Sequence, residues 1–132
     1  MIGIVIISHS IKIAEGIIDL CNEMVGDNIK IIPAGGSSDG RIGTDPIKIK
    51  EAIEKAYDGD GVVILADIGS SLMNADMAME LLEEEIRKKT IILDTPVVEG
   101  SIGVAVQASI SNDINQILQV AEEARTTKKV NK

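Results

Sequence analysis

The chain carries a single histidine, His9, in the tripeptide Ser8-His9-Ser10 that follows the apolar run at residues 2–7. An apolar run followed by small polar residues and a helix-period segment is typical of a strand that turns into a helix. In an open parallel α/β sheet, ligands gather at the carboxyl ends of strands, beside helix N-termini whose free N–H groups favour anions. A nucleophilic imidazole in that position is well placed to accept a phosphoryl group.

A second chemical residue, Asp67, closes the apolar run at residues 62–66 and opens an Asp-Ile-Gly-Ser-Ser turn that leads into a helix. If the strands take the order 2-1-3-4, the strands that end at His9 and Asp67 are neighbours, about 4.8 Å apart. A carboxylate that accepts from one imidazole nitrogen fixes the tautomer and leaves the lone pair of the other nitrogen free to attack. Helix N–H groups at residues 10–13 or 70–72 can receive the phosphoryl oxygens.

The glycine-rich segment at residues 35–44 reads Gly-Gly-Ser-Ser-Asp-Gly-Arg-Ile-Gly-Thr and invites comparison with a nucleotide-binding P-loop. Arg41 and Ile42 stand where a P-loop has the lysine and the hydroxyl residue that hold phosphate and magnesium. Asp39 would also place a carboxylate inside the phosphate cradle. We therefore favour a mobile rim around the His9 pocket, which meets a partner or shields the phosphoryl group.

Composition excludes several classes of function. The 132 residues include 21 acidic and 13 basic side chains, for a net charge of −8, with one Tyr and no Phe or Trp. Nucleic-acid binding needs a basic footprint and usually aromatic stacking surfaces, so it is not expected. The lone Cys21 excludes an internal disulfide and suits a reducing compartment. We find no secretion signal and no apolar run long enough for a membrane helix, and therefore expect a cytoplasmic protein. The sequence also contains no ligand set for a metal or other cofactor, and none is expected.

The elements that must position these residues alternate between β-rich runs and helix-period segments. This pattern predicts one α/β domain, residues 1–132, with a doubly wound, mainly parallel four-stranded sheet and helices on both faces. The predicted strands are residues 2–7, 29–32, 62–66 and 90–93, and residues 96–98 could add a short antiparallel edge strand. The predicted helices are residues 10–25, 46–57, 71–88, 99–110 and 111–126.

Two of these helices carry signals that the structure can test. Asp45 suits the N-cap of the second helix and Pro46 suits its first position. Methionine and leucine side chains of the third helix are expected to point inward as core filling, not as a metal site. They are Met73, Met77, Leu81 and Leu82. In the first helix, the apolar positions at helical spacing are Ile13, Ile17, Leu20, Cys21 and Met24.

Four segments together resemble a known family. They are Ser8-His9-Ser10, the loop at residues 35–44, the turn at residues 67–71 followed by Met73-Asn74, and Val98-Glu99-Gly100. In this order and spacing they are similar to the DhaM family, the phosphotransfer subunits of phosphoenolpyruvate-dependent dihydroxyacetone kinases. That family has the mannose-type enzyme IIA fold of the bacterial sugar phosphotransferase system. Each segment is a weak signal alone, whereas four in order are specific, and they cover essentially the whole chain.

The resemblance implies a phosphotransferase in which His9 takes a phosphoryl group from the phosphocarrier protein HPr, with Asp67 orienting the ring. His9 would pass the group to ADP held by a second subunit, DhaL, which phosphorylates dihydroxyacetone bound to a third, DhaK. The family also implies a homodimer, and phosphorylation at Nε2 with Nδ1 facing the aspartate. The residues implied at the phosphoryl or partner contacts are Ser8, Ser10, Gly36, Ser37, Gly40, Arg41, Gly43, Thr44, Gly69, Ser70 and Ser71.

Two alternatives stay open. Sugar-transporting mannose-type enzymes usually have a Gly-Gly-Ser-Pro turn after the aspartate, whereas residues 69–72 read Gly-Ser-Ser-Leu, which favours the dihydroxyacetone branch. In the sugar-transport branch, His9 would instead feed a membrane-associated enzyme IIB. In a non-catalytic interaction module, His9 and Asp67 would only cap helices or satisfy loop groups. A response-regulator receiver fits less well because it needs an acidic pair where Ser8 and His9 stand.

Overall fold

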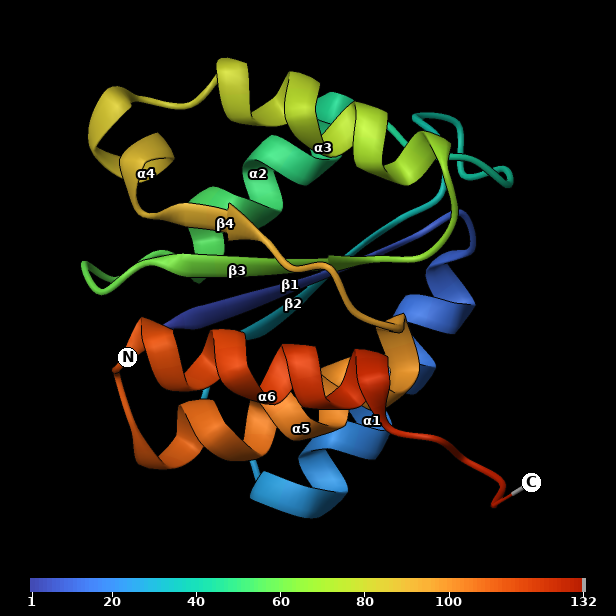
Figure 1. The fold of residues 1–132 in the computed structure, drawn as a ribbon. Helices are drawn as coiled ribbons and strands as arrows, with labels where there is room; N and C mark the ends of the chain where they lie inside the picture. The colour runs from blue at the N-terminus through green and yellow to red at the C-terminus, as the bar shows by residue number, and fades with distance from the viewer. Residues whose placement is uncertain (132) are drawn as a thin grey trace.

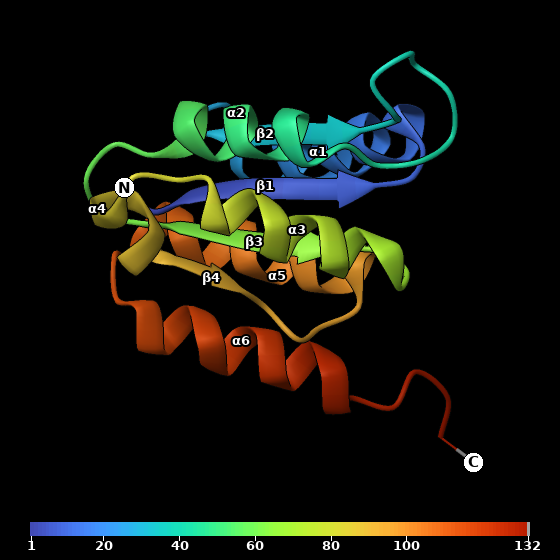
Figure 2. The same ribbon diagram turned by 90° about the horizontal axis from the view of Figure 1, so that it is seen from above.

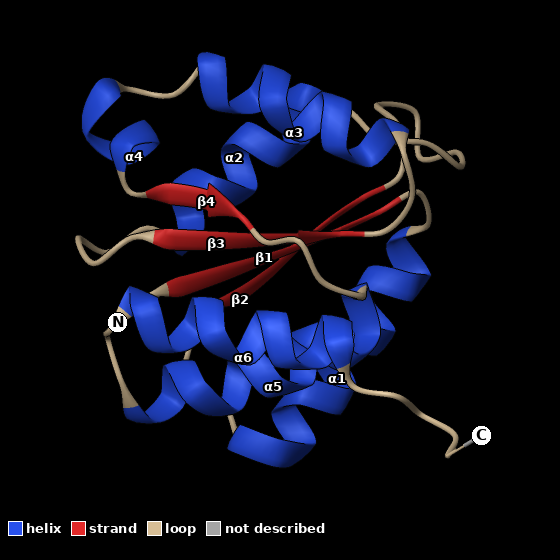
Figure 3. Cartoon of the chain, in the orientation of Figure 1, coloured by secondary structure: helices blue, strands red, loops and turns tan. Residues whose placement is uncertain are grey.

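The computed structural model describes residues 1–131 as a four-stranded sheet and six helices. In chain order the elements are β1 (Gly3–Ser8), α1 (Ile11–Val25), β2 (Ile31–Gly35), α2 (Pro46–Ala56), β3 (Val62–Ala66), α3 (Ser70–Glu80), α4 (Glu84–Lys88), β4 (Thr90–Ile92), α5 (Val97–Ile110) and α6 (Ile114–Thr126). Figure 3 shows how the helices enclose the sheet. Across residues 1–131, no helix has the length and apolar character needed to cross a bilayer.

The sheet has the order β2-β1-β3-β4, and each neighbouring pair is parallel. Helices α1, α5 and α6 cover one face, and α2, α3 and α4 cover the other (Figures 1 and 2). The predicted fold class and strand order are therefore confirmed. Because the strands are parallel, β1, β2 and β3 all end at the same edge of the sheet, where α1 and α3 begin.

Alternation along the buried strands builds a separate core on each face. Ile4 and Ile6 of β1 pack with the core that contains α1, α5 and α6, whereas Val5 and Ile7 pack with α2 and α3. Side chains of a strand point alternately to the two faces, so a strand covered on both sides is apolar throughout. All six residues of β1 are buried, which fixes the register of the strand that ends at the histidine.

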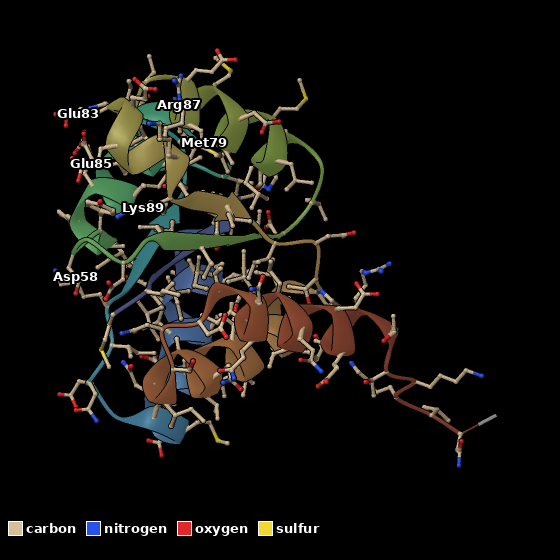
Figure 4. The ribbon with its side chains drawn as sticks, turned by 60° about the vertical axis from the view of Figure 1, so that its left-hand side comes forward. Asp58, Met79, Glu83, Glu85, Arg87 and Lys89 are labelled. Carbon is tan, nitrogen blue, oxygen red and sulfur yellow. The ribbon has the colours of Figure 1, made fainter. Side chains whose placement is uncertain are left out.

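The predicted third helix is wrong in two respects. Residues 71–88 form two helices, α3 and α4, and the side chains of Met73, Met77 and Leu81 are 69%, 54% and 50% exposed. The buried side of α3 consists instead of small residues, Ser71, Ala75 and Ala78. Small side chains let α3 approach α2 closely, and this close approach turns the larger residues outward. Figure 4 shows Met79 beside α4, near Arg87, whereas Glu83 and Glu85 lie at the outer edge of this segment.

Two further expectations need correction. Residues 96–98 do not form an antiparallel edge strand, because α5 begins at Val97 and its first turn closes through Gly100 N–H, which donates to Pro96 O at 2.8 Å. In α1, Ile17 and Cys21 are buried, whereas the three remaining apolar positions at helical spacing are exposed. They are Ile13, Leu20 and Met24.

The start of α2 is as predicted. Asp45 is the N-cap, its Oδ1 accepts from Ile47 N–H at 3.1 Å, and Pro46 is the first helical residue. This cap fixes the point at which the glycine-rich segment ends and the helix begins.

Gly35, at the end of β2, allows the glycine-rich segment to pass close to α1. A Cβ at this position would lie 2.7 Å from Ile11 Cα and 2.9 Å from Ile11 N, both of them backbone atoms. We expect Gly35→Ala to lower the free energy of unfolding by about 2 kcal/mol, because backbone must shift to make room. Urea denaturation measures this change.

Gly16→Ala is the matched control, because nothing lies within 4 Å of its Cβ position in the middle of α1. It should raise stability by roughly 0.5–1 kcal/mol, the ordinary gain of alanine over glycine in a helix. Equal effects of the two substitutions would contradict the close approach of β2 to α1.

Candidate functional site

The ends of β1 and β3 bring His9 and Asp67 together. The parallel ladder pairs Ile7 with Ala66, and Asp67 N–H donates to Ile7 O at 3.1 Å, one residue beyond β3. This extra bond places the aspartate beside the last residue of β1 and the histidine that follows it. The side chains of His9 and Asp67 are 20% and 16% exposed.

The Asp67 carboxylate accepts from four donors, two on each oxygen. Oδ2 accepts from Ser8 Oγ–H at 2.9 Å and from His9 backbone N–H at 3.0 Å. Oδ1 accepts from Ser71 Oγ–H at 2.6 Å and from the His9 ring nitrogen Nδ1 at 3.0 Å. A carboxylate has about four acceptor sites, so this group is fully satisfied in one orientation.

These hydrogen bonds keep Asp67 ionised. Burial alone would raise the pKa of Asp67, but the bonds from Ser71, the His9 backbone, Ser8 and the His9 ring outweigh it and lower the pKa to about 2. Asp67 is therefore a carboxylate at any pH near neutrality. As an acceptor without a proton of its own, it requires hydrogen on Nδ1 of the imidazole.

The second ring nitrogen, Nε2, faces the first turn of α3. With the Nδ1 proton directed at Asp67, Nε2 carries the lone pair and accepts from Ser70 Oγ–H at 2.6 Å. Ser70 is exposed and its hydroxyl can rotate away, because a serine side chain has staggered alternatives. The ring is thus held on one side by a partly buried carboxylate and on the other by a hydroxyl donor that can rotate away.

Backbone dipoles supply positive potential at the site of this acidic chain. Helix α1 begins two residues after His9, and α3 begins at Ser70, whose hydroxyl touches the ring. Ser10, the N-cap of α1, donates its backbone N–H to Ser8 Oγ at 3.1 Å, and Gly69 is the N-cap of α3. Two helix N-termini that meet at one histidine favour an anionic group bound there.

The glycine loop, residues 36–44, lies at the rim of the site. Gly36 N–H donates to Ser8 O at 3.4 Å, and Gly43 N–H donates to His9 O at 2.8 Å. Within the loop, Ser37 N–H donates to Arg41 O at 2.8 Å and Gly40 N–H donates to Ser37 O at 3.0 Å. Gly36 and Gly40 have φ values of +78° and +83°, a region that favours glycine.

Arg41 is not brought to the histidine. Its side chain is 84% exposed and pairs at 3.0 Å with Asp39 of the same loop. Arg41 and Gly40 therefore form the outer tip of the glycine loop, whereas Gly36 and Gly43 contact the segment around His9. This arrangement also argues against a P-loop, because the carboxylate of Asp39 occupies Arg41 at the tip and would repel a phosphate there.

Sequence reasoning missed two residues that hold the glycine loop. Lys48 of α2 donates from Nζ to Ser37 O at 2.7 Å, and Asn74 of α3 donates to Thr44. Asn74 was visible in the sequence only as part of a motif. Only the structure distinguishes it: Asn74 is a partly buried polar residue in a helix whose other buried or partly buried residues are small or apolar.

Two cavities flank the site, and His9 lines neither of them. One of about 260 Å³ lies between β2, the glycine loop and α2, and another of about 270 Å³ opens beside Asp67 between the ends of β3 and β4. The histidine sits on a rim between them. An open rim suits a reacting group that another macromolecule presents, since small-molecule sites usually enclose most of their ligand.

The fold and this site define a class of protein. A model of the EIIA-man family, described as PTS system fructose IIA component, matches residues 3–118, and the chain belongs to this family.

Within that family, the curated relatives are DhaM proteins. The chain is 44% identical to PEP-dependent dihydroxyacetone kinase 2, phosphoryl donor subunit DhaM, of Listeria innocua over 119 residues, which cover 90% of the chain and 95% of that protein. It is 39% identical to the DhaM subunit of Escherichia coli over 132 residues, which cover 98% of the chain but only 28% of that longer protein. The chain is thus a member of the DhaM group.

Solved structures agree with the fold. The protein EF1359, described as of unknown function, is 38% identical with a TM-score of 0.86, and the match covers 97% of each chain. A phosphotransferase system component EIIA from Streptococcus agalactiae is 13% identical with a TM-score of 0.69, covering 95% of this chain and 92% of that one. At that identity the second likeness concerns the fold alone.

Proposed function

We propose that the chain is a phosphohistidine carrier, the phosphoryl donor subunit of a phosphoenolpyruvate-dependent dihydroxyacetone kinase. His9 is the nucleophile and Asp67 orients it. The observation that carries the proposal is the 3.0 Å contact between His9 Nδ1 and Asp67 Oδ1, which leaves Nε2 at the open rim. The names of the DhaM relatives support the same class of reaction.

The chemical step is an in-line transfer between two imidazoles. The Nε2 lone pair attacks the phosphorus of a phosphorylated donor protein, a P–Nε2 bond forms, and the P–N bond to the donor breaks. The donor imidazole leaves with the electron pair of that bond. His9 keeps its Nδ1 proton, so its ring becomes cationic, and the Asp67 carboxylate stabilises that charge.

The phosphoryl oxygens need donors once Nε2 is occupied. Ser70 must release Nε2 before attack, and its hydroxyl can then donate to a phosphoryl oxygen. The first turns of α1 and α3 contribute backbone N–H groups and the positive ends of their dipoles.

We assign the partners from the family resemblance. HPr is the donor, and ADP bound to DhaL is the acceptor, so that an ADP oxygen attacks the phosphorus, the P–Nε2 bond breaks and ATP forms on DhaL. DhaL then phosphorylates dihydroxyacetone bound to DhaK. We also propose that the chain forms a homodimer. Analytical ultracentrifugation tests this by measuring the mass of the particle in solution.

Labelled phosphoenolpyruvate tests the carrier function. With enzyme I and HPr, we expect the chain to acquire a phosphate that is labile in acid and stable in base, as a phosphoramidate bond is. Filter binding after acid or alkaline treatment measures it. An unlabelled chain would leave the non-catalytic interaction module as the better description.

The acceptor separates the two phosphotransfer branches. The phosphorylated chain should lose its label rapidly to ADP-loaded DhaL and retain it when offered a mannose-type enzyme IIB. The absence of proline at residues 69–72 favours this outcome. Rapid loss to enzyme IIB alone would assign the chain to sugar transport.

A further inference from the structure

Asn74 links α3 to the glycine loop. It lies one helical turn beyond the serines that contact the His9 ring, and its side-chain amide donates to Thr44 Oγ1 and, at 3.4 Å, to Thr44 O. Asn74 is partly buried, and it does not touch His9 or Asp67 through any of its hydrogen bonds. It therefore lies outside the group of side chains that prepares the nucleophile.

Thr44 carries this link back to the histidine. The preceding residue, Gly43, donates its N–H to His9 O at 2.8 Å. Helix α3 thus reaches the histidine by two routes: directly, through Ser70 and Ser71 on the ring, and indirectly, through Asn74 and the end of the glycine loop. The direct route does not depend on Asn74.

We propose that Asn74 is a positioning residue that holds the glycine loop at the rim, so that the phosphorylated donor protein meets a preformed surface. This inference rests on the proposed function. The loop tip exposes Arg41 and Ile42, which are 84% and 76% exposed and available to a docking protein. A loop ordered before docking costs less conformational entropy on association, so its anchor contributes to affinity and not to the chemical step.

Asn74→Ala separates these two contributions. We expect the KM for the phosphorylated donor protein to rise about fivefold, because the variant loses the hydrogen bond to Thr44 Oγ1 and the long bond to Thr44 O, which together contribute about as much as one ordinary hydrogen bond. The kcat should change by less than about twofold, because the ring keeps its contacts with Asp67, Ser70 and Ser71. Uptake from phosphoramidate, a small donor that needs no docking surface, should be unchanged.

A reciprocal substitution tests the contact itself. Thr44→Val removes the hydroxyl that accepts from Asn74 and keeps the side-chain volume, and it should raise the KM less than Asn74→Ala, which also loses the bond to the carbonyl. The double variant should be no worse than Asn74→Ala alone, because Asn74→Ala already removes both hydrogen bonds between the two residues. Asn115→Ala is the matched control, an exposed asparagine of α6 on the opposite face of the sheet.

Amide hydrogen exchange provides a readout that needs no partner protein. In Asn74→Ala the Gly43 amide should exchange faster, whereas amides in the middle of α1 should keep their wild-type rates. Unchanged Gly43 exchange, additive effects in the double variant, or an equal loss with phosphoramidate would each overturn the proposal. If wild-type protein takes no label from HPr, the proposed function has failed, and Gly43 exchange still decides whether Asn74 holds the loop.

Discussion

Replacement of His9 by asparagine is expected to abolish phosphoryl uptake. An asparagine amide can still donate to the Asp67 carboxylate, so the hydrogen bonds around that group are largely preserved and the fold should survive. Its nitrogen, however, has no lone pair available for attack on phosphorus, because that pair is delocalised into the carbonyl. Since the chain has no other histidine, no second imidazole can take over. Labelling through enzyme I and HPr should fall to background.

The pattern of lability identifies any label that remains. Phosphate on Asp67 would be an acyl phosphate, which alkali hydrolyses, whereas a phosphohistidine survives alkali. The control is Asn115→Ala, which should label like the wild type, and thermal unfolding should show that His9→Asn is folded. Acid-labile, alkali-stable label on folded His9→Asn would remove His9 from the reaction.

The candidate pair was predictable because topology alone positions it. His9 and Asp67 each follow a continuous apolar run, and parallel strands in the order 2-1-3-4 must end side by side at one edge. The number of residues between His9 and Asp67 does not matter for this prediction, because only the strand order decides which strand ends are neighbours. For the same reason the N-cap at Asp45, with Pro46 after it, was readable from local backbone chemistry.

What the sequence did not reveal depends on packing distance. In α3, size and polarity suggested that Met73 and Met77 face inward, but close packing against α2 needs Ala75 and Ala78 there. At residues 96–98, two valines favoured a strand, whereas the closing bond to Pro96 O starts a helix. A binary apolar pattern contains no information about how closely two elements approach.

The contacts of the two serines with His9 and Asp67 were only partly predictable from the sequence. Ser70 and Ser71 were expected near the phosphoryl group because they start a helix. Which of the two would bind Nε2 and which would bind Asp67 follows only from the direction in which α3 leaves the sheet. Asn74 is harder still, since its partner Thr44 is 30 residues away along the chain and in a loop.

Replacement of Asp67 by alanine is expected to slow phosphoryl uptake by roughly tenfold or more, because the group that fixes the imidazole tautomer is lost. Without a carboxylate at Nδ1, the ring can place its proton on Nε2, where it blocks attack. The cationic ring formed after transfer also loses its counter-charge. Single-turnover uptake from labelled HPr measures the rate, with circular dichroism as the check on folding.

Asp67→Asn distinguishes electrostatic orientation from mere space filling. The amide has nearly the volume of the carboxylate, but it offers one oxygen with two acceptor sites where four donors converge, so at least two donors must be left unpaired. If Asp67 only filled space, this variant would keep its rate while the alanine variant lost it. Because the charge and the acceptor geometry matter, we expect Asp67→Asn to be at least as slow as Asp67→Ala. A wild-type rate of uptake in either folded variant would show that Asp67 does not act in the transfer step. The tautomer of the His9 ring would then have to be fixed by another group.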